Sequence, residues 1–150
     1  MLGLKTPEIG GRPDADESPY PSIPRTSDRE TILVIDDEAA LRDILADVLE
    51  ENGYHILTAP DGPAGMDILL SEQPIDLLIT DVRLPNGMNG REVATAARIR
   101  RPGLKILFIT GFAGDVLKGA SRLEEGMELL TKPFDLVRLP VTVRRLIDGE

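Results

Sequence analysis

Three carboxylates and one lysine follow directly after short apolar segments of the sequence. Asp36 and Asp37 come after TILVI, Asp81 comes after IDLLIT, and Lys132 comes after MELLT. If these segments are parallel strands, their carboxyl ends meet at one edge of a sheet, so the four side chains share a site. Carboxylates without a soft ligand nearby favour a hard divalent ion, magnesium before zinc. A carboxylate can also attack phosphorus and a lysine can hold a phosphoryl oxygen, so the sequence predicts metal-assisted phosphoryl transfer.

Each of these residues also has a simpler structural explanation. Helix capping explains one acid of the Asp36–Asp37 pair, but it does not explain two acids beside a third at another strand end. Thr110 alone is an ordinary strand residue, and Lys132 alone is a solvated charge near a turn. Together they fit one site, in which the Thr110 hydroxyl and the Lys132 amine bind phosphoryl oxygens. His55 is the only histidine, and it lies in a predicted strand away from this site, so we predict no catalytic role for it.

The composition limits the classes of protein to which the chain can belong. It has 150 residues, 41% of them hydrophobic, which suits one domain with its own core. The net charge of −9, from 17 basic and 26 acidic residues, argues against a surface for nucleic acid or anionic membranes. The absence of cysteine excludes disulfides and thiolate metal sites. We see no secretory signal and no segment of membrane-spanning length, so we expect a soluble, cytoplasmic protein.

The first 29 residues differ in composition from the rest of the chain. They contain several prolines among Gly, Ser, Asp and Glu, and little apolar content. Such a segment cannot bury enough apolar surface to offset the entropy lost on ordering. We therefore predict a mobile tail or linker over residues 1–29 and a single domain over residues 30–150.

From Thr31 the sequence alternates between strand and helix patterns. Continuous apolar runs rich in β-branched residues predict strands that are buried on both faces. Between the strands, apolar residues recur at helical spacing, although glycines interrupt the fourth helix, expected within 113–126, and Pro140 delays or kinks the last one. This alternation predicts an α/β fold with a three-layer, doubly wound, five-stranded parallel sheet. The predicted strands are 31–36, 54–59, 75–81, 105–110 and 127–132.

The ordered motifs VIDDE, LLITDVRLP, NGMNGREVA, LFITGF and LLTKPF resemble the receiver domain of two-component response regulators. The resemblance spans about 30–149, and the combination of motifs is highly specific. It implies a flavodoxin-like sheet with strand order 2-1-3-4-5, in which Asp81 accepts a phosphoryl group from the phosphohistidine of a histidine kinase or histidine phosphotransfer protein. It also implies a signal carried to the face formed by helix four, strand five and helix five. The implied ligands of Mg²⁺ (or Mn²⁺) are Asp36, Asp37, Asp81 and the backbone carbonyl of Arg83, and the implied phosphoryl-binding switch residues are Thr110 and Lys132.

The sequence departs from the family pattern at several positions. Many members carry an aromatic switch residue three positions before the lysine, where this chain has Leu129, so that form of the switch cannot operate. An aromatic residue, Phe112, instead follows two positions after Thr110, and FITGF looks like the Phe-Ala-Thr-Gly-hydrophobic-Tyr motif of a receiver subgroup. The NGMNG segment is similar to the longer loop of receivers fused to hybrid kinases. Arg83 and Phe112 flank the expected path of an attacking water, so we expect their bulk to protect the phosphoryl group.

Competing functions differ from this prediction in specific residues. A haloacid-dehalogenase-type phosphatase needs an acid two positions after its nucleophile, where this chain has Arg83. A pseudo-receiver that only binds partners would be marked by loss of the acid pair, of Asp81 or of Lys132, and none is lost. A transcription factor would need a DNA-binding module, for which the chain leaves no room. We therefore expect a stand-alone regulator or the receiver of a hybrid kinase, which is not an enzyme beyond its own phosphorylation and dephosphorylation.

Overall fold

Five parallel strands form the centre of the molecule in a computed structural model that describes residues 29–111 and 123–149. Their order in the sheet is β2-β1-β3-β4-β5, which confirms the predicted doubly wound fold. Each strand begins and ends within two residues of the predicted range. The strands are β1 (Thr31–Ile35), β2 (His55–Ala59), β3 (Leu77–Asp81), β4 (Lys105–Thr110) and β5 (Met127–Thr131).

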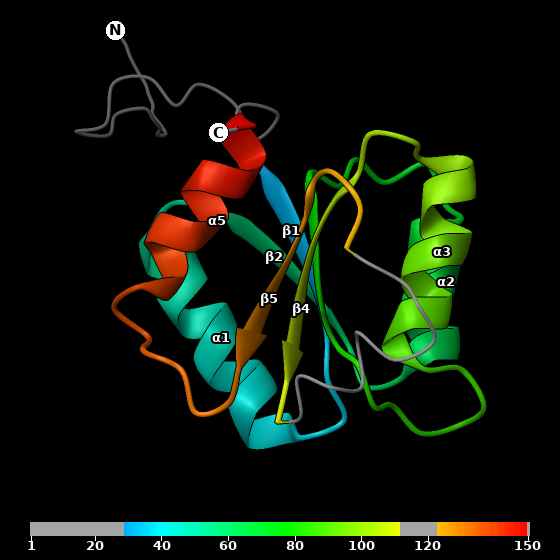
Figure 1. Cartoon of the computed structure of the whole chain (residues 1–150), viewed down its shortest axis with the longest axis horizontal. Coiled ribbons are helices and arrows are strands. Elements are labelled where there is room, and N and C mark those ends of the chain that lie inside the picture. Colours follow the sequence, from blue (N-terminus) through cyan, green and yellow to red (C-terminus); the bar gives the residue numbers. More distant parts are fainter. Residues whose placement is uncertain (1–28, 112–122, 150) are drawn as a thin grey trace, which may run out of the picture. The chain divides into compact units, whose positions relative to one another are not determined.

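The described helices cover both faces of the sheet. In Figure 1, α1 and α5 lie on one side, and α2 and α3 lie on the other. No helix in the described ranges is both long and apolar enough to cross a membrane. Most of the segment predicted as the fourth helix lies outside the described residues, and its described end, 123–126, is loop and turn. The helices are α1 (Ala39–Glu51), α2 (Gly62–Leu69), α3 (Gly90–Arg100) and α5 (Leu139–Asp148).

The strands are buried on both faces because helices pack on both sides of the sheet. In β1, Leu33 and Ile35 belong to one core cluster with residues of α2 and α3, including Val93. Ile32 and Val34 belong to a second cluster with residues of α1 and α5. Every residue of β1 is buried, so the strand appears in the sequence as a continuous apolar run rather than as an alternating one.

The helix boundaries follow local capping signals. Asp61 caps α2 by accepting a hydrogen bond from the backbone N–H of Ala64 at 2.8 Å, and Pro63 stands in the first turn. After α1, Gly53 adopts a left-handed φ of 95°, which turns the chain towards β2. The last helix begins late, at Leu139, with a proline in its first turn, as predicted. Local residue chemistry thus sets these two helix starts and the turn after α1.

Candidate functional site

The carboxyl edge of the sheet gathers the three predicted acids. One carboxylate oxygen from each of Asp36, Asp37 and Asp81 lies within 4.8 Å of the others. Asp36 and Asp81 are buried, with 2% and 8% of their surface exposed, whereas Asp37 is exposed. The neighbouring acids Asp36 and Asp37 reach the same place because β1 ends at Ile35, where the alternation of side chains between two faces stops.

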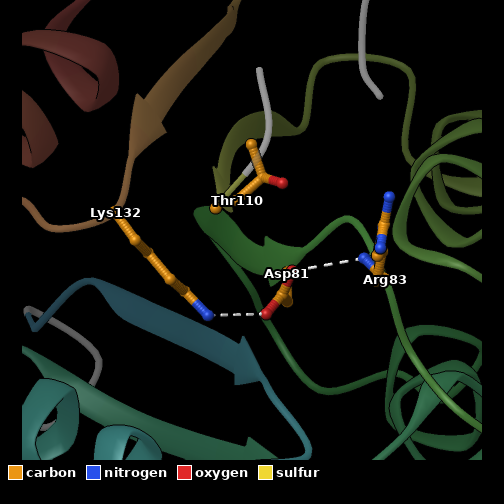
Figure 2. A pocket seen from close by; sticks show the side chains of 5 residues that line it. Asp81, Arg83, Thr110 and Lys132 are labelled. Carbon is orange, nitrogen blue, oxygen red and sulfur yellow. Dashed lines mark hydrogen bonds and ion pairs between the residues drawn. The ribbon is translucent and has the colours of Figure 1, made fainter. Parts of the chain in front are cut away.

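Asp81 ends β3 and has a hydrogen-bond donor on each carboxylate oxygen. The amine of Lys132 donates to Oδ2 at 2.8 Å, and the backbone N–H of Arg83 donates to Oδ1 at 3.2 Å (Figure 2). Lys132 is held beside the sheet by its own backbone N–H, which donates to the Thr110 carbonyl at 2.8 Å. The Lys132–Pro133 peptide bond is cis. The ends of β3, β4 and β5 therefore bring Asp81, Thr110 and Lys132 together.

A pocket of about 490 Å³ opens at this edge of the sheet. Thr110 ends β4 and is almost completely buried, with 1% of its surface exposed. In Figure 2, the side chains of Asp81 and Lys132 point towards each other, Thr110 lies near both, and Arg83 lies beside Asp81 on the side away from Lys132. The lining residues are Asp81, Arg83, Thr110, Gly111 and Lys132. Four of these five residues were predicted from the sequence to belong to the site.

The charges at this edge are unbalanced. Burial raises the pKa of Asp36, and the charges of Asp81 and Asp37 raise it further, although the Glu38 N–H and the Lys132 amine act in the opposite direction. Burial alone would lower the pKa of Lys132, but the hydrogen bond and charge of Asp81, together with Asp36 and Glu38, outweigh it and raise this pKa. The amine of Lys132 thus bonds only one of the three clustered carboxylates, and the remaining negative charge is what a divalent cation would neutralise.

The three acids also provide the donor chemistry that a magnesium ion requires. Mg²⁺ prefers oxygen ligands, and protein sites usually hold it with a few carboxylates while water or phosphate completes its shell. The cluster offers three carboxylate oxygens within 4.8 Å of one another and no nitrogen or sulfur ligand. Its donor set and its surplus charge therefore fit a hard divalent ion.

Two further residues at the site were not predicted from the sequence. The hydroxyl of Thr80, a fully buried residue, donates to the Asp81 carbonyl at 2.9 Å. Gly90 begins α3 so close to β3 that an added β-carbon would overlap the Asp81 carbonyl oxygen. The signal for Gly90 was present, because Asn89 and Glu92 have the spacing of a capping box and place the helix start at this glycine.

The remaining predicted residues lie as follows. Phe112 lies outside the described residues, so its predicted place beside the path of water stays a prediction. Leu129 lies in β5 opposite Phe108 of β4 and packs against the core cluster on the α2 and α3 face. His55 begins β2 and is therefore at the opposite edge of the sheet, away from the acids.

Comparison with known proteins identifies the family. The model of the response regulator receiver domain matches residues 32–144. The response regulator receiver protein CpdR of Brucella abortus is 36% identical, and the match covers 77% of this chain and 95% of CpdR. Two other curated relatives are probable transcriptional regulatory proteins, of Picosynechococcus and of Mycobacterium tuberculosis, and the chain spans only about half of their length, 50% and 49%.

Solved structures give the same result. The receiver domain of the hybrid histidine kinase CckA is 32% identical, with a TM-score of 0.66, over 78% of this chain and 98% of that domain. The response regulator TrrA of Thermotoga maritima, solved in complex with Mg²⁺ and BeF, is 31% identical, with a TM-score of 0.66, over 78% of this chain and 98% of TrrA. The chain therefore belongs to the family of response regulator receiver domains, which act in two-component signalling.

Proposed function

We propose that Asp81 accepts a phosphoryl group from the phosphohistidine of a histidine kinase or of a histidine phosphotransfer protein. A carboxylate oxygen of Asp81 would attack phosphorus, the phosphorus–nitrogen bond would break, and its electron pair would return to the imidazole. The observation that carries the proposal is the position of the Asp81 carboxylate, 2.8 Å from the Lys132 amine and within 4.8 Å of two further acids. This function corresponds to a phosphoacceptor and not to an enzyme with a separate substrate.

Lys132 and Thr110 would bind the oxygens of the transferred group. The Lys132 amine already contacts an oxygen of Asp81, and a compact cation there would stabilise the negative charge of an aspartyl phosphate. Thr110 lines the same pocket and carries a hydroxyl that can donate to a second oxygen. Arg83 also lines the pocket, and together with Phe112 it would limit the access of water to the phosphoryl group.

A magnesium ion, or manganese in its place, would be held by Asp36, Asp37, Asp81 and the backbone carbonyl of Arg83. When bound, it would neutralise the repulsion between the acids and the incoming phosphoryl group. The clustered carboxylates support this assignment, as does the Mg²⁺ in the complex of the similar regulator TrrA. The Glu38 N–H donates to Oδ1 of Asp36 at 2.8 Å and so favours the ionised carboxylate that would bind the ion.

The signal would pass to the face formed by the fourth helix, β5 and α5. Two contacts support this route: the Lys132 N–H bonds the Thr110 carbonyl between the ends of β5 and β4, and Arg145 of α5 bonds Glu128 of β5 at 2.6 Å. Because Leu129 replaces the usual aromatic residue, the movement of Thr110 and Lys132 would act without that partner.

We further propose that residues 30–150 form the receiver and residues 1–29 a tail or linker. The chain would act in the cytoplasm, as a stand-alone regulator or as the receiver of a hybrid kinase, and without a nucleic-acid partner.

Incubation with acetyl phosphate, with and without Mg²⁺, tests this proposal by intact-mass measurement. The wild type is expected to gain one phosphoryl group only with Mg²⁺, and Asp81→Asn is expected to gain none. A beryllofluoride titration followed by NMR at Thr110 and Lys132 separates a short-lived adduct from an inert site. If no adduct forms and beryllofluoride moves neither signal, the chain is a pseudo-receiver that only binds partners, and the proposal is wrong.

A further inference from the structure

The loop between β3 and α3, residues 82–89, is fixed beside Asp81 at both of its ends. At its start, the Arg83 N–H donates to the Asp81 carboxylate at 3.2 Å. At its end, Gly90 begins α3, and its N–H donates to the Val82 carbonyl at 2.8 Å. Asn89 caps that helix through a reciprocal pair of hydrogen bonds with Glu92. These contacts set where the loop begins and ends but leave its middle to other contacts.

The start of α2 contacts the middle of this loop at two points. The side-chain amide of Asn86 donates to Oδ2 of Asp61 at 2.7 Å, while Oδ1 of the same carboxylate caps α2. Directly after Asp61, Gly62 lies so close to the loop that an added β-carbon would stand 2.7 Å from the carbonyl oxygen of Met88. We call these two contacts, Asp61–Asn86 and Gly62–Met88, the loop clamp.

The middle of the loop contains a backbone conformation that is uncommon outside glycine, at Asn86. Asn86 and Gly87 both have left-handed φ values, 69° and 93°. A left-handed φ is uncommon outside glycine, although asparagine tolerates it better than most residues. Only two residues, Leu84 and Pro85, separate Asn86 from Arg83, whose backbone N–H bonds Asp81.

We propose that Asp61 and Asn86 are positioning residues, which hold the Arg83 backbone in place for metal binding and for phosphorylation of Asp81. The inference rests on the proposed function, in which the Arg83 carbonyl is a magnesium ligand. Neither residue would touch the ion or the phosphoryl group. Gly62 has a related part, because the absence of a side chain lets Met88 approach α2. The start of α2 lies in the connection between β2 and β3, whereas the loop that it contacts follows β3. In this proposal, a segment that precedes β3 therefore helps to shape the site at its end.

Asn86→Gly and Asp61→Ser test the clamp and can be combined in a double-mutant cycle, because glycine removes the side-chain amide of Asn86 and keeps the left-handed φ without strain. Serine is a good helix cap, so Asp61→Ser keeps a cap on α2 while its shorter side chain does not reach Asn86. Asn52→Ala is the matched control, since Asn52 is another exposed asparagine whose amide donates a hydrogen bond, to Val48 O at 2.8 Å, away from the site. The measurements are the Mg²⁺ dissociation constant, followed by NMR of the Arg83 amide, the hydrogen exchange of that amide without metal, and acetyl-phosphate kinetics.

Each single variant is expected to weaken Mg²⁺ binding between about twofold and tenfold, which is the effect of losing one hydrogen bond. The Arg83 amide should exchange faster without metal, and phosphorylation should need more Mg²⁺ while its rate at saturating Mg²⁺ stays near that of the wild type. The double variant should be no weaker than either single variant, because both remove the same contact. Asn52→Ala should leave all three measurements unchanged.

Other results would overturn the clamp. Wild-type Mg²⁺ affinity and Arg83 exchange in both single variants would show that the loop keeps its shape without the contact. Additive losses in the double variant would show that Asp61 and Asn86 act separately. If the wild type binds Mg²⁺ but gains no phosphoryl group, the proposed function fails, and the clamp is still judged by Mg²⁺ affinity and amide exchange alone.

Discussion

The two edges of the sheet use charged residues in different ways. At the amino edge, two charged residues have backbone partners: Asp76 accepts from the Thr31 N–H at 2.8 Å, and Arg101 donates to the carbonyls of Leu69 and Ser71 at 3.0 and 2.9 Å. At the carboxyl edge, three carboxylates lie together, and the amine of Lys132 bonds one of them, Asp81. The bonds at the amino edge satisfy backbone groups at the ends of strands and helices, whereas the carboxyl edge keeps an excess of negative charge.

Pockets at the two edges of the sheet do not explain this difference in charge. The amino edge also has a pocket, of about 360 Å³, against about 490 Å³ at the carboxyl edge. Both pockets are lined in part by charged side chains. What distinguishes the edges is therefore the balance of charge and the burial of the acids, since charged groups are seldom buried unless they are paired or bind an ion. The comparison teaches that an unbalanced, buried acid cluster is a better sign of function than a pocket.

The largest expected contrast is between the lysines of the two edges. Lys132→Met removes the cation that contacts Asp81, so we expect phosphorylation by acetyl phosphate to slow between about 10-fold and 100-fold, as for loss of a charged hydrogen bond. Lys105→Met removes an amine that donates to the Leu146 carbonyl, at 3.2 Å, and should change the rate by less than about twofold. Rates from intact-mass time courses measure both effects. Equal losses in the two variants would show that Lys132 has no special part.

A glycine at each edge of the sheet gives a second comparison. Gly90→Ala puts a β-carbon against the Asp81 carbonyl oxygen, and the backbone there cannot move aside cheaply. We expect the free energy of unfolding to fall by about 1–3 kcal/mol, as for overpacking, with weaker phosphorylation. Gly103 lies at the amino edge with no atom near its added β-carbon, so Gly103→Ala should change stability by less than about 0.5 kcal/mol. Urea unfolding of both variants decides the point, and a neutral Gly90→Ala would mean that α3 can shift on β3.

The sequence predicted the elements of this fold well because the signals are local. Strands buried on both faces appear as continuous apolar runs, and Asp61, Pro63 and Pro140 mark helix starts by their own chemistry. The gathering of Asp36, Asp81 and Lys132 followed from topology, since parallel strands end at one edge. The family motifs supplied the assignment of roles to these residues.

Other features could not be predicted because they depend on distances between segments. Neighbouring acids have the same local pattern, so the sequence did not tell that Asp36 is buried and Asp37 exposed. The contacts of Gly90 with Asp81, and of Asp61 with Asn86, depend on how closely α3 and α2 pack against the β3–α3 loop. Periodicity gives the face of a helix but not its distance from the next segment.

A change at the amino edge should affect stability without affecting function. Asp76→Ala removes the acceptor of the Thr31 N–H, and Thr31 is buried at the first position of β1. Because Asp76 itself is exposed and water can partly replace it, we expect a loss of about 1 kcal/mol in the free energy of unfolding. Asp76→Asn keeps an acceptor oxygen and should restore most of this. Both variants should be phosphorylated at the wild-type rate, and a slowed rate would contradict the separation between the two edges.

The smallest expected effect is the pH dependence of the acid cluster. Because burial, and then Asp81 and Asp37, raise the pKa of Asp36 above its ordinary 3.8, the folded protein holds this proton more tightly than the unfolded chain does. Asp36 therefore contributes stability below the unfolded pKa, and this contribution is lost as the pH rises through the folded pKa.

We expect the free energy of unfolding of the wild type, without metal, to rise relative to that of Asp36→Asn as the pH falls from about 7 towards 4. The amide introduced by this substitution keeps an acceptor for the Glu38 N–H but cannot ionise, which makes the variant the proper reference. Asp61 works in the opposite direction, since its pKa is lowered by the Ala64 N–H and by Asn86, but it is common to both proteins and cancels. Urea unfolding at each pH measures the difference. Mg²⁺ should reduce the pH dependence of this difference in unfolding free energy, because it favours the ionised carboxylate. A difference that does not vary with pH would mean that the charge on Asp36 is already compensated within the folded protein.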